Sequence, residues 1–297
     1  MTFYGIPPAS IRRALSPESG TEHARAIVGD AIAWWQENRG GTSDLPIAVG
    51  TLATLALAAP PTPAGRDFGP LLIPLNDAGI TDALRAIWNT CWAQNPVLTD
   101  TARPLHEWLA QPSETDTRGL ADYARVLIRA GLLEYASDVT RCEEEDVLGL
   151  IVQRMRSYSQ RQPVGQFFTP STVANHMAGN LLSEPLPHGA RLVEPCAGTG
   201  TMIRAAAATL RSQGTDPADF HWWMNDIDPL LAGCLSANAA LWRLGPRVTV
   251  SCGDSLRSVQ DLADSARQRA AAAIAEQQRT PTLYPTPNWP SSYWQPG

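Results

Sequence analysis

The sequence predicts an α/β protein in which an all-helical N-terminal domain precedes part of a doubly wound sheet. The first observation is a strand, a glycine turn and a helix that follow one another over residues 190–210. The second is that strand and helix alternate again over 220–244 and over 247–278. The third is that residues 1–140 show only helical periodicity.

These patterns divide the chain into three segments. We expect a helical domain at 1–140 and the sheet domain at 141–279. The last segment, 280–297, contains five prolines, two tryptophans and two tyrosines. Such a composition is typical of an extended, flexible tail.

Composition limits the possible functions of the chain. It has 297 residues, a formal net charge of −6 and 44% hydrophobic residues, which is enough for two domains with their own cores. A negative balance excludes binding of nucleic acid through bulk charge, so any such contact requires a local basic patch. All 23 basic residues are arginine, which we attribute to codon usage in a GC-rich genome.

We expect the protein to be cytoplasmic. Its five cysteines lack Cys-x-x-Cys spacing, so we expect neither a zinc site nor a disulfide framework. Residues 1–20 lack the basic and apolar regions of a signal peptide. The longest apolar run, 45–59, is interrupted and too short to span a bilayer, so we expect no membrane partner.

The N-terminal domain is predicted to be a succession of helices without a chemical motif. Apolar residues recur at helical spacing, and glycines or prolines separate the segments. We interpret its tryptophans as core residues rather than as a base-stacking surface. Helices are expected at 21–39, 45–59, 81–92, 104–111 and 119–136, with Thr81 as the N-cap of the third.

An acidic run at 143–146 precedes a predicted helix over 147–158. Carboxylates in the first turn of a helix face its positive end, so this run requires no functional explanation. The helix ends among Arg154, Arg156 and Arg161. For these arginines we expect solvated positions at a helix C-terminus or, alternatively, contacts with phosphate.

The next helix is predicted over 171–182, with Thr169 as its N-cap and Pro170 as its first residue. Phe167 and Phe168 come directly before this start. Two interpretations remain open for the pair, because it could form a hydrophobic staple or one wall of a ligand pocket.

The central stretch, 190–202, reads as a buried strand that ends in Glu194 and continues into a tight turn. Gly198 and Gly200 stand in this turn, where the backbone must bend sharply and let a ligand approach. A helix of small and apolar residues follows over 201–210. Ligands of doubly wound sheets bind at this edge, where the strands have their carboxyl ends.

Two further predicted strands also end in carboxylates. The second strand, 220–224, is followed by Asp226, and the third, 247–252, is followed by Asp254. Glu194 therefore belongs to a set of three acids at successive strand ends. Three acids at this spacing, together with the glycine turn, point to one ligand with amine and hydroxyl groups that bridges neighbouring strands.

These motifs resemble those of the amino-methylating DNA methyltransferases, most closely the modification subunits of type I restriction systems and their adenine-N6 relatives. Residues 166–170, Gln-Phe-Phe-Thr-Pro, are similar to the family's motif X, and an Asp-Val-Leu-Gly helix start at 146–149 precedes them. Residues 194–200 resemble motif I, 225–228 motif II and 253–256 motif III. The order is that of the family, and the resemblance covers about residues 140–256.

The resemblance implies S-adenosylmethionine as cofactor and DNA adenine as methyl acceptor. Asp226 would accept the ribose hydroxyls, Asp254 the adenine amine, and Glu194 would lie near the amino-acid end. This acidic set suits a cofactor with a cationic sulfur and an ammonium group. The cofactor-binding residues that the resemblance implies are Phe168, Thr169, Glu194, Pro195, Ala197, Gly198, Gly200, Asp226, Ile227, Asp254 and Ser255.

The family's catalytic loop, Asn/Asp-Pro-Pro-aromatic after a fourth strand, does not occur in this sequence. In the family that loop binds the target amine and stacks the flipped base. Asn288, in Asn-Trp-Pro, is the nearest substitute, but no apolar strand precedes it. We therefore assign no catalytic residue and keep Asn288 as the one candidate.

A sheet of three strands in the order 3-2-1 leaves its first strand, near 192–193, as an open edge. Such an edge pairs with a partner polypeptide or is covered by another part of the same chain. The sequence allows two main interpretations. In one, the chain is the cofactor-binding component of a restriction-modification methyltransferase, and a partner supplies the catalytic loop and DNA recognition. In the other, it is a non-catalytic cofactor-binding or regulatory protein derived from such an enzyme. A helical module with a purely structural sheet does not explain why all three acids and both glycines are present.

Overall fold

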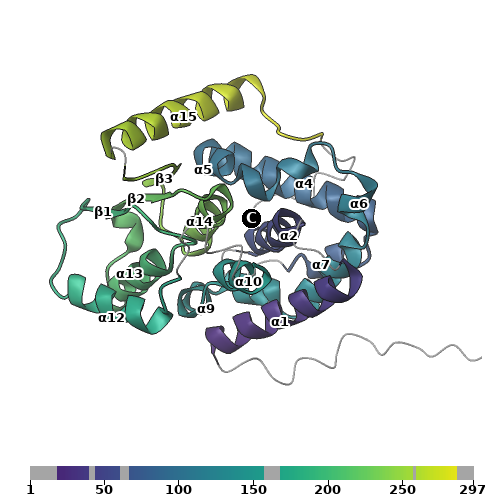
Figure 1. The fold of residues 1–297 in the computed structure, drawn as a ribbon, viewed down its shortest axis with the longest axis horizontal. Helices are drawn as coiled ribbons and strands as arrows, with labels where there is room; N and C mark the ends of the chain where they lie inside the picture. The colour runs from purple at the N-terminus through teal and green to yellow at the C-terminus, as the bar shows by residue number, and fades with distance from the viewer. Residues whose placement is uncertain (1–18, 40–43, 61–66, 157–167, 257–258, 286–297) are drawn as a thin grey trace, which may run out of the picture.

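A computed structural model describes residues 19–39, 44–60, 67–156, 168–256 and 259–285. The described chain combines many helices with one small sheet, which confirms the predicted α/β class (Figure 1). None of the described helices has both the length and the apolar character that a bilayer crossing requires.

The described residues of the N-terminal part form helices and 3-10 turns, and none of them forms a strand. Helix α2 (Leu45–Leu57) is apolar on nearly all sides, so it is buried in the middle of the other helices (Figure 1). The surrounding elements are α1 (Gly20–Asn38), α3 (Gly69–Leu72), α4 (Asp77–Gln94), α5 (Pro96–Thr101), the 3-10 turns Arg103–Leu105 and Glu107–Leu109, α6 (Glu114–Thr117), α7 (Leu120–Arg129), α8 (Leu132–Ser137), α9 (Val139–Glu144) and α10 (Val147–Met155).

Three of the predicted helices differ in the structure, and one of them, 104–111, consists of the two 3-10 turns instead of an α-helix. Thr81 does not cap α4, because Asn76 begins the helix earlier by accepting a hydrogen bond from the Gly79 amide at 2.9 Å. Thr81 instead lies inside the helix and donates to the Asp77 carbonyl. The segment predicted as one helix over 119–136 is divided into α7 and α8 by Gly131, whose φ of +90° is incompatible with a continuous helix.

The sheet consists of three parallel strands in the order β1-β2-β3: Arg191–Glu194, His221–Asp226 and Val248–Cys252. Helices α13 (Thr201–Ser212) and α14 (Pro229–Leu241) connect them, and α15 (Val259–Arg279) follows. In Figure 1, α13 lies on one side of the sheet with α12 (Ser171–Leu181), and α15 lies on the other.

Strand β1 is less buried than predicted. Among the described residues it pairs only with β2, and the Val193 side chain is 50% exposed. The physical reason is its position, since β1 forms the edge of the sheet that faces away from the helical part (Figure 1). The opposite edge is covered, because α5 contacts β3.

The helical part and the sheet share one hydrophobic core. Trp88 of α4 and Trp222 of β2 belong to the same cluster of buried side chains. The Arg243 side chain donates to the Ser137 carbonyl across the two parts at 2.8 Å. The division of the chain near residue 140 therefore stays a prediction.

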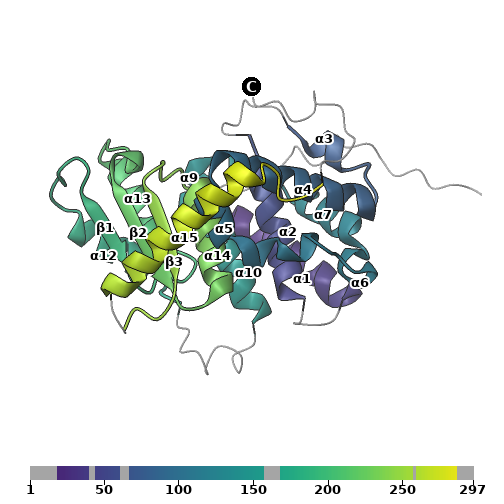
Figure 2. The same cartoon turned by 90° about the horizontal axis from the view of Figure 1, so that it is seen from above.

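The segment predicted to be a flexible tail is anchored over its first residues. Tyr284 is buried, and its backbone exchanges two hydrogen bonds of 3.0 Å with the Asn89 side chain. Its phenol oxygen lies 2.6 Å from Nδ1 of His106. These contacts attach the chain after α15 to the helical part (Figure 2). Residues 286–297, with Asn288, lie outside the described residues.

Candidate functional site at the carboxyl ends of the strands

Because the three strands are parallel, their carboxyl ends meet at one edge of the sheet. Asn225, buried in β2, connects the loops that leave its two neighbours. Its amide nitrogen donates to the carbonyls of Pro195 at 3.1 Å and Gly253 at 2.8 Å, and its oxygen accepts from the Ser251 hydroxyl. Asn225 therefore holds the loop of the first glycine turn beside the loop after β3.

Asp226 is the best defined acid of the predicted set. It is 8% exposed, and one carboxylate oxygen accepts from the Gly198 amide at 2.8 Å while the other accepts from the Asp228 amide at 2.9 Å. Burial is the largest influence on this group and raises the pKa of Asp226, although both amides oppose the shift. Each carboxylate oxygen carries two lone pairs, so both can accept a further donor such as a hydroxyl.

The two glycines of the turn have different surroundings. Both have positive φ, +59° at Gly198 and +107° at Gly200. A Cβ at Gly198 would meet no atom within 4 Å, so this side of the turn is open to a ligand. A Cβ at Gly200 would lie 2.6 Å from the Trp242 ring and 2.7 Å from Leu235, so helix packing explains this glycine. The predicted contact of the Gly200 backbone with the cofactor stays a prediction.

Glu194 and Asp254 stand in the two loops that border this opening. Glu194 accepts from the Cys196 amide at 3.1 Å, and Asp254 accepts from the Leu256 amide at 3.0 Å. The loops meet where Cys196 Sγ and Ser255 Oγ lie 3.5 Å apart. Both acids are partly exposed, and the Ile227 side chain beside Asp226 is 58% exposed. The edge thus combines carboxylates with an accessible apolar side chain.

The residues before α12 are placed differently from the prediction. Pro170, with φ −57° and ψ 139°, takes the N-cap position, so Thr169 does not cap the helix. Phe168 is half-buried and packs against the main hydrophobic core. Phe167 lies outside the described residues, and a role for Phe168 and Thr169 in a pocket wall stays a prediction.

Sequence reasoning missed a buried polar network beneath the glycine turn. Asp146 is 5% exposed and Asn238 1% exposed. The Asn238 amide donates to Asp146 Oδ1 at 2.9 Å and to the Thr199 carbonyl at 2.8 Å. A Cβ on Gly149 would lie 2.4 Å from Asp146 Oδ2 and 2.6 Å from Thr199 Oγ1. These contacts tie the start of α10 to α14 and to the turn between the two glycines.

The acidic run at 143–146 is therefore more than a favourable helix start. Burial is the first cause that raises the pKa of Asp146, and the Asn238 and Thr199 side chains oppose it. Glu143 is also buried and forms an ion pair with Arg211 of α13. One sequence signal was present, since Asn238 and Ser236 are the polar residues of a helix that is otherwise apolar.

Arg156 has a partner that neither sequence interpretation considered. It forms an ion pair with Asp228, with nitrogen–oxygen distances of 2.7 and 3.4 Å. Asp228 also caps α14 by accepting from the Leu230 amide at 2.9 Å. The arginine therefore holds the loop after Asp226 instead of standing in solvent at a helix end.

Comparison with known proteins gives one relative by sequence. No family model matches the chain. It is 36% identical over 83 residues to the type II methyltransferase M.BsuBI of Bacillus subtilis, an alignment of 28% of this chain and 16% of that protein. The chain thus spans only a small part of a curated methyltransferase. A methyltransferase subunit of a type I restriction-modification system from Streptococcus thermophilus superposes with a TM-score of 0.48 at 12% identity, covering 81% of this chain and 60% of that one.

Proposed function

We propose that the carboxyl edge of this sheet binds S-adenosylmethionine. We further propose that the chain is the cofactor-binding component of an adenine-N6 DNA methyltransferase of the restriction-modification type. One observation carries the proposal. Gly198, a glycine with an open side, is held by its amide against the buried carboxylate of Asp226 on the neighbouring strand.

The residues at this edge fit the chemistry of the cofactor. Asp226 has lone pairs left for the ribose hydroxyls, and the open side of Gly198 admits the ligand to the backbone. Glu194 and Asp254 supply negative charge for the ammonium group and the adenine amine. Ile227, with Pro195, Ala197 and Ser255 in the adjoining loops, completes the proposed contacts. When bound, S-adenosylmethionine supplies a methyl group on a cationic sulfur, and the protein's task is to hold and orient it.

Methyl transfer to DNA further requires a loop that binds the target amine. The sequence contains no Asn/Asp-Pro-Pro-aromatic stretch, and no strand follows β3 in the part of the chain that the structure describes. We therefore propose that a partner chain supplies this loop together with target recognition, and that DNA is bound by the complex. The same observation favours a second candidate, a cofactor-binding regulatory protein without catalysis of its own.

Calorimetric titration of the chain with S-adenosylmethionine tests the proposal. Its demethylated product should bind as well, whereas free methionine, which lacks the ribose and adenine, should bind far more weakly. Saturable binding of the two nucleoside compounds is the expected result. The absence of heat at millimolar cofactor would overturn the proposed site. Methylation of DNA by the isolated chain would overturn the need for a partner.

A further inference from the structure

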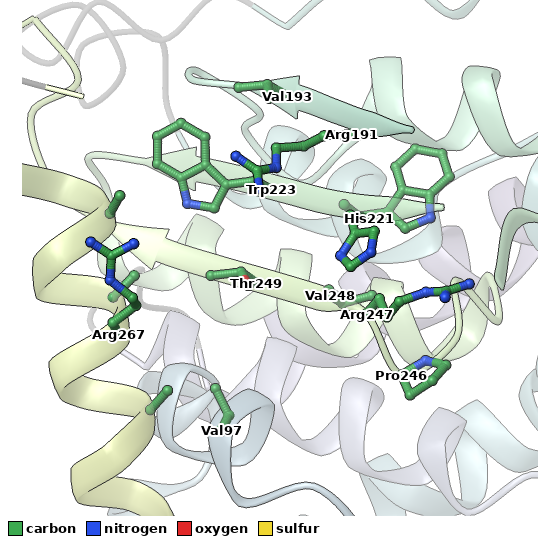
Figure 3. A pocket seen from close by; sticks show the side chains of 14 residues that line it. Val97, Arg191, Val193, His221, Trp223, Pro246, Arg247, Val248, Thr249 and Arg267 are labelled. Carbon is green, nitrogen blue, oxygen red and sulfur yellow. The ribbon is translucent and has the colours of Figure 1, made fainter. Parts of the chain in front are cut away.

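A groove lies on one face of the sheet and extends to β1 at its edge (Figure 3). Its lining includes none of the residues of the candidate cofactor site. Its volume is about 510 Å³. The strands contribute Arg191, Val193, His221, Trp223 and Thr249, while α5 contributes Val97 and α15 contributes Ala263, Ala266, Arg267 and Ala270. Several of these side chains precede or begin the strands, whereas the glycine turn follows a strand end, so the two sites use different ends of the sheet.

The charged side chains of the groove are all basic. Arg191, Arg247 and Arg267 line it together with His221, and none of the described aspartates or glutamates lines it. Arg267 already forms an ion pair with Asp264 of the same helix, which leaves Arg191 as the arginine on the β1 side. This contrasts with the net charge of −6 for the whole chain. The Arg247 guanidinium is anchored by a hydrogen bond of 2.8 Å to the Ala218 carbonyl, which keeps its positive charge beside the groove. The groove is therefore suited to an acidic occupant.

The floor of the groove is apolar and roomy. Helix α15 presents alanines to it, which leave the space that larger side chains would fill. The half-exposed Val193 and the Trp223 ring lie on the sheet side in Figure 3. Such a floor accepts apolar side chains better than a sugar-phosphate backbone. An occupant must therefore bring both apolar and acidic groups.

The outer edge of β1 adjoins this floor and offers backbone hydrogen bonds. In a parallel strand, successive residues direct their amide and carbonyl groups to opposite sides. The Ala190 carbonyl accepts from the His221 amide of β2, so Leu192 also faces β2. Arg191 and Val193 then direct their backbone groups outward. Edges of this kind pair with an added strand.

We infer that this surface binds a second polypeptide through an extended segment that pairs with the β1 edge. Its apolar side chains enter the groove over Val193 and Trp223, and its acidic side chains meet Arg191. Alternation of the two kinds suits a strand, because every second side chain points to the same face. The inference deepens the proposed need for a partner, but it rests on a surface remote from Gly198.

A second copy of the chain fits this surface less well. Two β1 edges would pair about a two-fold axis perpendicular to the sheet. Both basic grooves would then lie on the same side, and their arginines would repel each other. An acidic partner strand avoids this repulsion. We therefore assign the surface to a different polypeptide, and self-association becomes an outcome of the test.

Fluorescence anisotropy with a labelled peptide of alternating valine and glutamate tests this inference. Its counterpart with lysine in place of glutamate is the control for charge. We expect the acidic peptide to bind saturably and the basic one not to bind. Val193→Pro should prevent binding, because it removes an outward amide and no bond to β2. Arg191→Glu, which leaves the backbone unchanged, should weaken binding roughly tenfold or more.

Matched substitutions on other surfaces separate a local effect from a general one. Val173→Asp changes a valine of α12 that is 46% exposed, and Arg25→Glu reverses an arginine of α1 whose side chain is 60% exposed. Both should bind the peptide like the wild type. Three results would overturn the inference: equal affinity for the acidic and basic peptides, displacement of the acidic peptide by single-stranded DNA at lower concentration, or dimerisation that Arg191→Glu strengthens.

The same variants distinguish a failure here from a failure of the proposed cofactor site. Arg191→Glu should bind S-adenosylmethionine like the wild type, because Arg191 lies at the other end of β1 from the glycine turn. Binding of the peptide without binding of the cofactor would refute the proposed function alone. Binding of the cofactor with no binding of the peptide would refute the partner surface alone.

Discussion

Replacement of Asp226 by alanine tests the centre of the candidate site. The substitution removes the carboxylate that accepts from the amides of Gly198 and Asp228. It also removes the proposed acceptor for the ribose hydroxyls. Hydrogen bonds to a charged group contribute about 1.5–3 kcal/mol. The dissociation constant for S-adenosylmethionine should therefore rise roughly 10- to 150-fold.

The assay is calorimetric titration of wild type and variant under identical conditions, with circular dichroism to show that both are folded. Asp216→Ala is the matched control, because Asp216 also accepts from the amide two residues ahead, that of Ala218, but lies before β2 instead of at its end. It should bind the cofactor like the wild type. A folded Asp226→Ala protein with wild-type affinity would refute the assignment of the second strand end.

Three further predictions concern the protein around the site. Affinity for S-adenosylmethionine should fall on acidification, because burial raises the pKa of Asp226 and its protonated carboxyl is a weaker acceptor. Asp226→Ala, titrated at the same pH values, should not show the part of this fall that protonation of Asp226 causes. Asn238→Ala should lower the free energy of unfolding in urea by about 2–3 kcal/mol, because it leaves the buried Asp146 carboxylate without its amide partner. Ser236→Ala on the same helix should lower it by less than about 1 kcal/mol. Burial lowers the pKa of His106 from 6.5 to about 4. The neutral imidazole therefore stabilises the fold fully above pH 6.5, and this stabilisation, about 3 kcal/mol, is lost as the pH falls toward 4. Urea unfolding of His106→Gln should not show this loss.

Local patterns were sufficient to predict the elements that position the site. The strand-and-helix alternation after residue 190 indicated all three strands to within a few residues, because apolar runs and glycine turns are defined by residues that are close together in the sequence. The glycine turn and Asp226 were found for the same reason. Their hydrogen bond joins two sequence motifs that the fold brings together.

The remaining features depend on contacts between distant parts of the chain. The burial of Asp146 follows from its position against Asn238, 92 residues away, which no local pattern contains. Tyr284 was placed in a tail because prolines surround it, yet it packs against the helical part near Asn89 and His106. The exposure of Val193 depends on the absence of a neighbouring strand on one side of β1 among the described residues.

Titration of two glycine variants with S-adenosylmethionine is the most direct test of the proposed cofactor site. Gly198 and Gly189 both have positive φ, +59° and +76°, and a Cβ at either would meet no atom within 4 Å. The backbone strain of an alanine should therefore be similar at both positions. Only Gly198 borders the proposed cofactor. We predict that Gly189→Ala binds like the wild type and that Gly198→Ala binds at least about tenfold more weakly. Equal affinities in two folded variants would contradict a cofactor site at this turn.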